Sequence, residues 1–474
     1  MTPRYEAPPG SAPTLEIPDL DGVRSVHMVG IGGAGMRNLA KLFMARGIAI
    51  TGSDLKGSKA VLELRAAGVP VSIGHGRDHI GSPDALVVSS AIPHTNPELL
   101  EARARGIPVW VRAQALAAAA RDARAIAVAG THGKTTTTAM VGLVLERAGL
   151  DPTLVVGGEP NESGSGARLG ATDLFVAEAD ESDGSFLLFR PEIGIVTNIE
   201  LDHIDFYAGG LDEIEAAFAL FAERSAHVVA CADDDGAMRA VRRAGTPVLT
   251  YGTAPDADVR IEVSSPGPGG ARGWLRASDE RVEVVLAVDG VHNLRNAAAA
   301  AATARILGVP LGEAADALAA FRGVHRRFEH RGTARGAKFY DDYGHIPTEL
   351  GVTIDVARRM RPRRVIAVFQ PHRYARTLAL WRELGASLVE ADVVVVTDVY
   401  GADQQPIPGV TGKLVVDGIS DADRSVRVVY VPRRADAVSF LASEVRPGDL
   451  VVTMGCGDVW MLGDAALERI AEAS

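Results

Sequence analysis

The sequence predicts an α/β protein built around mainly parallel sheets, and three observations support this fold class. Short apolar runs rich in β-branched residues alternate with helical patterns along nearly all of the 474 residues. Most of these runs are continuous rather than alternating, which is typical of strands buried on both faces of a parallel sheet. Two glycine-rich turns each lie between an apolar run and a helical pattern, as in a βα unit.

The predicted strands follow one another along the chain in a repeated βαβ order. They span residues 26–29, 48–51, 86–89, 125–129, 174–177, 193–197, 227–231, 364–369, 393–397 and 450–454. Helical patterns at residues 135–148 and 293–307 lie between them. The glycine- and proline-rich stretch 264–273 is predicted to be a hairpin loop.

The pattern restarts twice, which predicts three domains. One restart is the turn near residue 129, and the other follows the arginine-rich stretch 325–331. We place the domains at residues 20–120, 121–324 and 325–474. Residues 1–19 are rich in proline and polar side chains, lack the features of a signal peptide, and are expected to form a disordered tail.

Composition excludes several classes of protein. The net charge of −11 argues against broad nucleic-acid binding, which needs a dense basic face. No apolar run is long enough to span a membrane. The two cysteines, Cys231 and Cys456, predict neither a disulfide framework nor a zinc site. A cytoplasmic protein is expected, either a monomer or a homodimer.

The first glycine loop, G-I-G-G-A-G-M at residues 30–36, follows a predicted strand and opens a helix. Gly30, Gly32 and Gly35 fit the spacing that lets a backbone approach a diphosphate at a helix N-terminus. Asp54 closes the next strand, where an acid could bind ribose. Taken alone, this loop indicates a nicotinamide-dependent dehydrogenase; a glycine turn with only a structural role is the other interpretation.

The second glycine loop, A-G-T-H-G-K-T-T-T at residues 129–137, resembles a P-loop. Its backbone N–H groups would hold phosphates, Lys134 would reach the β- and γ-phosphates of ATP, and the Thr135 hydroxyl would bind Mg²⁺. Val128 stands where the strict motif has its first glycine. A structural turn that contains Gly-Lys-Thr by chance is therefore the alternative.

Acidic residues follow the next two predicted strands. Glu178 opens the segment E-A-D-E-S-D at residues 178–183, and His203 ends T-N-I-E-L-D-H at residues 197–203. Side chains at the carboxyl ends of parallel strands face the ligand crevice, and Mg²⁺ prefers oxygen ligands. We predict Glu178 as a magnesium ligand and His203 as a second ligand or phosphate donor. A solvated acidic loop and a structural histidine are the alternatives.

These motifs together resemble the ATP-dependent Mur ligases of bacterial peptidoglycan synthesis, over residues 26–463. Further shared segments are H-N-L-R-N-A at 292–297, R-R-F-E at 326–329, D-D-Y-G-H at 341–345, Q-P-H-R-Y-A-R-T at 370–377 and P-I-P-G at 406–409. The chain is most similar to the branch that adds L-alanine to UDP-N-acetylmuramate. The absence of lysine between Lys134 and Lys338 agrees with that branch, because related ligases place a carbamylated lysine there.

The resemblance implies an N-terminal Rossmann-like domain that binds the UDP substrate, a central P-loop ATPase-type mononucleotide-binding domain that binds ATP and Mg²⁺, and a C-terminal Rossmann-like domain that binds the amino acid. It also implies a role for each site residue. The UDP-substrate site would comprise Gly30, Gly32, Gly33, Ala34, Gly35, Asp54 and Ser90. The ATP site would comprise Gly130, Thr131, His132, Gly133, Lys134, Thr135, Thr136, Asn293, Asn296, Arg327 and Asp342. Lys134, His203, Arg327, Asp342 and His345 would be catalytic, and Thr135, Glu178 and His203 would bind Mg²⁺. Tyr343, His372, Arg373 and Arg376 would bind the amino acid.

Four positions depart from the family pattern, and three alternative functions stay open. Ile346 replaces a second histidine, Arg37 and Asn38 replace smaller residues, and Cys456 replaces a small residue. One alternative is a sister ligase that adds a tripeptide to the same nucleotide during wall recycling. The others are the dehydrogenase and a non-catalytic nucleotide-binding regulator.

Overall fold

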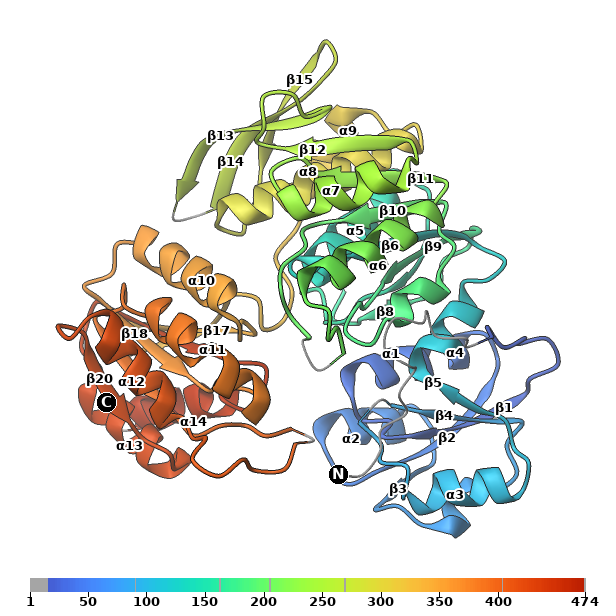
Figure 1. Ribbon diagram of the computed structural model, residues 1–474, viewed down its shortest axis with the longest axis horizontal. Coiled ribbons are helices and arrows are strands. Elements are labelled where there is room, and N and C mark those ends of the chain that lie inside the picture. The colour runs from blue at the N-terminus through green and yellow to red at the C-terminus, as the bar shows by residue number, and fades with distance from the viewer. Residues whose placement is uncertain are drawn as a thin grey trace. The chain divides into compact units, whose positions relative to one another are not determined.

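The computed structural model describes residues 16–89, 91–161, 163–203, 206–267, 270–402 and 404–472. It divides into two compact units at Arg322 and Gly323, apart from the short segment 267–269. Unit 1 precedes that point and contains two sheets, and unit 2 follows it and contains one (Figure 1).

The first sheet of unit 1 is parallel, with strand order β3-β2-β1-β4-β5. Its strands are β1 Ser25–Val29, β2 Ala49–Asp54, β3 Val71–Ile73, β4 Ala85–Val88 and β5 Val109–Val111. Its helices are α1 Ala34–Ala45, α2 Lys59–Ala66, the 3-10 turn η1 Arg77–Ile80, α3 Pro97–Ala104 and α4 Arg112–Ala119. Continuous burial of the last four residues of β1 explains its apolar sequence.

The second sheet of unit 1 has ten strands, in the order β15-β14-β13-β12-β11-β10-β6-β9-β7-β8. They are β6 Arg124–Ala129, β7 Thr153–Val155, β8 Ala167–Arg168, β9 Leu174–Glu178, β10 Ile193–Val196, β11 His227–Cys231, β12 Val248–Gly252, β13 Val259–Gly267, β14 Gly270–Ala277 and β15 Glu280–Val285. Its helices are α5 Lys134–Arg147, η2 Ser185–Leu188, α6 Leu211–Glu223, α7 Asp235–Ala244, α8 Val291–Ile306 and α9 Leu311–Leu318. Central β6 pairs in parallel with β9 and β10, so the ends of all three lie at one edge.

Unit 2 holds a six-stranded sheet with the order β16-β17-β21-β18-β19-β20. Its strands are β16 Glu329–Ala334, β17 Ala337–Asp342, β18 Arg364–Phe369, β19 Val393–Val396, β20 Arg427–Tyr430 and β21 Asp449–Met454. Its helices are α10 Pro347–Arg359, α11 Tyr374–Ala386, α12 Lys413–Ala422, α13 Arg434–Glu444 and α14 Trp460–Glu472. The β16–β17 pair is antiparallel, and the other pairings are parallel.

The structure confirms the α/β class with mainly parallel sheets. Each predicted strand overlaps an observed one, and the two predicted helices correspond to α5 and α8. The hairpin loop predicted at residues 264–273 is too long, because β13 and β14 fill most of that stretch through backbone pairing. Residues 268–269 between them, and most of the predicted tail, lie outside the described residues.

The domain boundaries stay a prediction. Within the described part of the chain, no helix has both the length and the apolar character needed to cross a membrane.

Candidate functional site

The second glycine loop connects β6 to α5, and its two glycines are required by geometry. Gly130 has φ +137°, and a Cβ atom there would lie 1.9 Å from the Thr197 Oγ1 atom. Gly133 has φ +78° and precedes α5 without a side-chain cap. A side chain at either position would be strained or would clash. The backbone N–H groups at the start of α5 are therefore left for an anion, as in phosphate-binding loops.

The segment after β10 holds this loop in place. The Asn198 carbonyl accepts the Thr131 N–H at 3.0 Å, and the Asn198 side-chain oxygen accepts the His132 N–H at 2.8 Å. The Thr197 hydroxyl donates to the His132 carbonyl at 2.6 Å. The Glu200 N–H donates to the Thr131 hydroxyl at 2.9 Å. Sequence reasoning quoted this segment but did not select Thr197 or Asn198, because their role is to support the loop.

Lys134 lies at the centre of the phosphate loop. Its ammonium donates to the Gly130 carbonyl at 2.6 Å and to the Glu181 carboxylate at 2.9 Å. Burial disfavours charge on Lys134, but Glu181, Asp180 and Glu178 outweigh burial and raise its pKa. Burial, together with Asp180, raises the pKa of Glu181 to about 7 despite the contact with Lys134. Lys134 is therefore a cation held by acids, with Glu181 as its carboxylate partner.

Thr135 and Glu178 meet at the carboxyl edge of the sheet. The Thr135 hydroxyl lies 3.0 Å from the Glu178 Oε2 atom, which also accepts the Gly157 N–H at 2.9 Å. Thr135 is buried, and Glu178 is partly exposed. A hydroxyl beside a carboxylate at a phosphate loop is a donor set that suits Mg²⁺, which completes its shell with phosphate oxygens and water. The residues therefore fit the predicted metal.

His203 lies beside the acids of the same edge. Its Nε2 atom is 3.9 Å from Glu181 and 3.4 Å from Asp202, and the Asp202 carboxylate accepts its backbone N–H at 2.7 Å. The backbone of His203 is left-handed, with φ +52°. Such strain in a side-chain-bearing residue is often found at functional sites. His203 thus lies close to Glu181 and Asp202, and Glu178 contacts Thr135 and Gly157.

Helix α8 brings its predicted ATP residues to the phosphate loop. The Asn296 side-chain oxygen accepts the Thr137 hydroxyl at 3.2 Å, and it would lie 2.9 Å from a Cβ atom on Gly133. The Asn293 amide donates to the Asp289 carbonyl at 2.6 Å. Asn296 thus lies against the phosphate loop, and Asn293 is fixed one helical turn before it.

The first glycine loop, which follows β1, is hydrogen-bonded to the end of the neighbouring strand β2. Gly30 N–H and Ile31 N–H donate to the Ser53 carbonyl at 2.8 and 3.1 Å, and Gly32 N–H donates to Asp54 at 2.9 Å. Asp54 therefore supports the loop directly, an interaction that the ribose assignment did not include. Helix α1 begins at Ala34, after Gly33, without a side-chain cap. Ser90 lies outside the described residues.

Arg112 connects the first glycine loop to the acidic motif. A Cβ atom on Gly35 would lie 3.1 Å from the Arg112 side chain, and the guanidinium lies 3.9 Å from the Asp180 carboxylate. Sequence reasoning did not select Arg112, because a single arginine before an alanine-rich helix gives no motif. Its position places a cation over the first turn of α1, where an anion would bind.

Arg37 and Asn38, which depart from the family pattern, contact the segment that follows β7. Arg37 pairs with Glu159 at 2.5 Å, and the buried Asn38 amide donates to the Val156 carbonyl at 2.7 Å. These larger polar side chains therefore join α1 to the neighbouring segment within unit 1.

In unit 2, Asp342 organises the turn after β17. Its two oxygens accept the Phe328 N–H at 2.8 Å and the Gly344 N–H at 2.7 Å. Burial raises its pKa, although Arg327 lowers it. The guanidinium of Arg327 lies 5.0 Å from the ring centroid of Tyr343, a cation–π contact. Asp342, Arg327 and Tyr343, all selected from sequence, form one cluster.

The other residues predicted to bind the amino acid lie in the same unit. His345 and His372 rings are 5.8 Å apart, and the Arg376 guanidinium lies 3.2 Å from His372 Nδ1. Arg376 is only 9% exposed, and Arg373, with φ +66°, precedes α11. Tyr400 stacks on His372 at 5.8 Å. Tyr400 was missed from sequence because it lies in an unremarkable loop after β19.

Two departures from the family pattern lie near this cluster, a buried Ile346 and a partly exposed Cys456. Ile346 is 4% exposed and precedes α10, so it packs where a histidine was expected. Burial raises the pKa of Cys456 to about 12, although Arg376 lowers it. Cys456 is therefore a neutral thiol close to Arg376.

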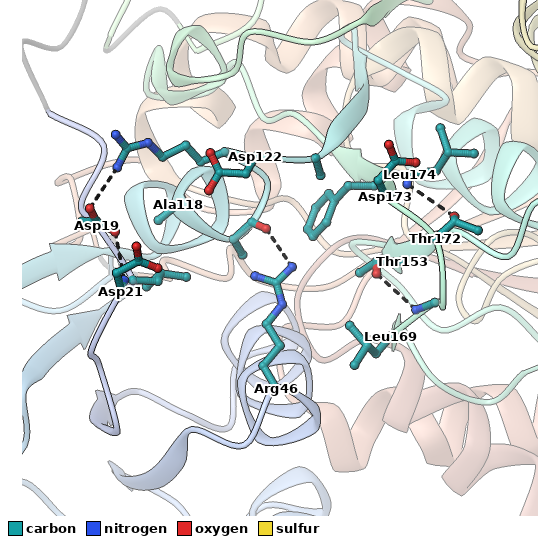
Figure 2. A pocket seen from close by; sticks show the side chains of 16 residues that line it. Asp19, Asp21, Arg46, Ala118, Asp122, Thr153, Leu169, Thr172, Asp173 and Leu174 are labelled. Atoms are coloured by element: carbon teal, nitrogen blue, oxygen red, sulfur yellow. Dashed lines mark hydrogen bonds and ion pairs between the residues drawn. The ribbon is translucent and has the colours of Figure 1, made fainter.

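A pocket of about 340 Å³ lies elsewhere in unit 1 (Figure 2). Its lining includes Thr153 and Leu174 at the amino ends of β7 and β9, whereas the phosphate loop follows the carboxyl end of β6. Figure 2 shows the Arg46 guanidinium donating to a main-chain carbonyl, that of Ala119, at 2.8 Å. The pocket is therefore distinct from the candidate site.

The fold and site define a class: an α/β protein with a phosphate-binding loop, adjacent acids and a second glycine loop. Comparison with known families gives a more specific identification. The chain matches the family models described as Mur ligase family, catalytic domain, at residues 25–124; Mur ligase middle domain, at 128–304; and Mur ligase, glutamate ligase domain, at 326–457. The chain belongs to the Mur ligase family.

Curated relatives and solved structures agree with this assignment. The chain is 48% identical to a UDP-N-acetylmuramate–L-alanine ligase of Rubrobacter xylanophilus, covering 94% of this chain and 100% of the relative. It is 43% identical to the enzyme of the same name from Pelotomaculum thermopropionicum, covering 96% and 99%. The solved UDP-N-acetylmuramate–alanine ligase of Thermotoga maritima is 28% identical, with a TM-score of 0.82 over 95% of this chain and 100% of that one.

Proposed function

We propose that this chain joins L-alanine to the lactyl carboxylate of UDP-N-acetylmuramate, with conversion of ATP to ADP and phosphate. The observation that carries this proposal is near full-length similarity to relatives of that name, together with an intact phosphate loop in which Lys134 faces Glu181. Membership of a family of ligases argues against the dehydrogenase hypothesis.

The reaction needs an activated carboxylate, because a carboxylate is a poor electrophile at neutral pH. The γ-phosphoryl group of ATP would pass to a lactyl carboxylate oxygen, releasing ADP and leaving an acyl phosphate. The amine of alanine would then attack the acyl carbon, form the amide bond, lose a proton and expel phosphate. Lys134 would stabilise charge on the transferring phosphoryl oxygens.

The metal that the family implies would supply further stabilisation of phosphate charge when bound. Thr135 and Glu178 are the residues that would hold it, since their oxygens are 3.0 Å apart at the phosphate loop. His203 stays the proposed second ligand. Its contacts with Glu181 and Asp202 place it among acids at the edge that carries Glu178.

The amino acid would bind in unit 2. Arg376 would hold the alanine carboxylate through two parallel hydrogen bonds, for which a guanidinium is better shaped than an ammonium. Its burial to 9% exposure favours a strong, desolvated contact. His345, whose ring contacts His372, would accept the proton lost by the attacking amine.

A second candidate is the ligase that adds a peptide. The solved murein peptide ligase of Psychrobacter arcticus is 25% identical, with a TM-score of 0.74 over 95% of this chain. The higher identity to alanine-named relatives, 48%, favours alanine.

The test is phosphate release with ATP, Mg²⁺ and UDP-N-acetylmuramate, with and without L-alanine. Release that needs every component supports the proposal. Release with the recycling tripeptide but not with alanine would replace alanine by the peptide. No release with either amine would contradict ligase activity on this nucleotide.

A further inference from the structure

One end of the sheet in unit 2 carries a group of exposed arginines. The β16–β17 turn, the α10–β18 connection and the α13–β21 connection lead into the amino ends of β17, β18 and β21. Backbone hydrogen bonds join them, because the Gly448 N–H donates to the Gly336 carbonyl at 2.9 Å and the Arg363 N–H donates to the Gly448 carbonyl at 2.8 Å. The three connections therefore form one surface. We call it the arginine surface, after its four exposed arginines: Arg335, Arg361, Arg363 and Arg446.

The acids close to the arginine surface are buried and already paired. The three connections contain no acidic residue between the elements that they join. Glu444 and Asp449, which flank the α13–β21 connection, are buried and contact the guanidinium of Arg364 at 2.8 and 2.7 Å. Other acids at this end of the sheet precede β19 and β20: Glu390, Asp392, Asp421 and Asp423. The positive charge of the arginine surface is therefore not neutralised locally.

The four guanidinium groups of the arginine surface differ from that of Arg364. Among the described residues, none forms an ion pair or a side-chain hydrogen bond with Arg361, Arg363 or Arg446. Arg335 donates only to the Ala442 carbonyl, at 3.2 Å. The backbones of Arg335 and Arg361 are left-handed, with φ +48° and +52°, a conformation that glycine or asparagine adopts with less strain. Four such cations on one surface, in a chain with a net charge of −11, would attract an anionic partner.

The composition of the arginine surface distinguishes two kinds of anionic partner. A specific protein interface has an apolar centre, often with aromatic anchors. The large apolar side chains that are exposed elsewhere in the described chain do not lie on the three connections. The remaining exposed residues there are Gly336, Pro447 and Gly448. A bilayer of anionic lipids needs no apolar centre, since its surface potential attracts basic side chains directly.

We propose that the arginine surface docks this chain on an anionic lipid bilayer, with headgroup phosphates as the partners of the guanidinium groups. Guanidinium matches phosphate oxygens through parallel hydrogen bonds. The attraction acts over about 8–10 Å in salt, so distant acids of the chain oppose it little.

This docking is compatible with an accessible site in unit 2. Asp342 ends β17 and His372 follows β18, and both strands pair in parallel with β21. These residues therefore lie at the carboxyl ends of the strands, opposite the arginine surface. The inference does not depend on the proposed function.

The experiment is sedimentation of the full chain with vesicles at low ionic strength. One set of vesicles is phosphatidylcholine alone, and the other is equal parts of phosphatidylcholine and phosphatidylglycerol. We expect the wild type to bind only the second set. The double variant Arg361→Ala/Arg363→Ala should lower the partition constant by about 5-fold for each arginine removed.

The matched control is Arg242→Ala/Arg243→Ala, which removes two exposed arginines from the last turn of α7 in unit 1. It should leave the partition constant unchanged. Arg446→Ala, on a different connection of the arginine surface, should lower it by about 5-fold. Thermal unfolding of each variant separates weaker binding from loss of the fold.

Several results would overturn the inference. They are equal binding of the wild type to both sets of vesicles, binding to neither, and an equal loss of binding in the control and in Arg361→Ala/Arg363→Ala. Binding to poly-glutamate without binding to vesicles would assign the surface to an acidic protein and overturn the lipid partner.

Discussion

At the scale of single residues, the charge of Lys134 is stabilised by the acidic residues around it. Its ammonium is 2.9 Å from Glu181, whose pKa is raised to about 7 by burial and by Asp180. Incoming phosphate would offer Lys134 a stronger partner than a carboxylate that takes up a proton near neutral pH. Glu181 is therefore suited to release the lysine to the nucleotide.

Lys134→Ala should lower kcat by roughly 10²–10³, as expected for loss of an electrostatic stabiliser. The variant should stay folded, because Glu181 can take up a proton once its partner is gone. Steady-state phosphate release and thermal unfolding measure both effects. Lys338→Ala, an exposed lysine on β17, is the control. A kcat near that of the wild type would remove Lys134 from the phosphoryl-transfer step.

His203→Ala should raise the Mg²⁺ concentration needed for half-maximal activity, since the imidazole is the proposed second metal ligand. We expect a shift of about 10-fold or more, the effect of losing a group that binds or orients a metal. Activity titrated with Mg²⁺ at saturating ATP measures it, with His227→Ala for comparison. An unchanged titration would show that His203 is not a metal ligand.

Which residues sequence could predict depends on how local their pattern is. Lys134 and Thr135 follow the loop after β6, Glu178 ends β9, and the structure brings these residues together at one edge of the sheet. The contacts of Glu98 with His27, His75 and His79 were not predicted. The three histidines are spread over more than 50 positions and approach Glu98 only in the folded chain. Asp54 was assigned to ribose, yet its carboxylate accepts a loop N–H, a contact that no spacing reveals.

At the scale of elements, α3 shows how one buried charge fastens a helix. Asn96 caps α3 through the N–H groups of Glu98 and Leu99, and Glu98 then reaches Ser53 on β2 and the turn at Gly76. The helix, a strand and a turn are thus joined through one carboxylate. This arrangement makes the first sheet sensitive to acid.

Stability should fall as pH drops because of this carboxylate. The pKa of Glu98 is about 2 in the folded chain against 4.5 ordinarily. Its ionised form thus stabilises the fold above pH 4.5, and that contribution is lost as pH falls toward 2. This lowering of the pKa corresponds to about 3–4 kcal/mol. The free energy of unfolding, measured with urea at pH values between 2 and 6, should change less with pH in Glu98→Gln than in the wild type. An equal change with pH in both proteins would contradict the assignment.

The elements that sequence predicted well are the long apolar strands. β18 and β21, for example, are almost continuously buried, so their composition alone identifies them. β3 and β5 have three residues each, too few for a pattern to emerge. β13 and β14 extend into a glycine- and proline-rich stretch that sequence indicates as loop, because pairing within the sheet overrides local preference there.

At the scale of the whole molecule, the family match spans both units, from residue 25 to residue 457. The two glycine loops belong to unit 1, and the cluster of Arg376 with His345 and His372 belongs to unit 2. A ligase that joins a nucleotide-linked acid to an amino acid needs all three kinds of site. Under the proposed function, the two glycine loops and the cluster in unit 2 would supply these sites.

The central claim is that the carboxylate is activated by phosphoryl transfer before the amine attacks. The direct measurement uses UDP-N-acetylmuramate labelled with ¹⁸O in its lactyl carboxylate, together with ATP, Mg²⁺ and L-alanine, and mass spectrometry of both products. The account predicts a nucleotide product heavier by one alanyl residue and one ¹⁸O atom in the phosphate released. An alanyl product with unlabelled phosphate would contradict the acyl phosphate, and no alanyl product would contradict the proposed reaction.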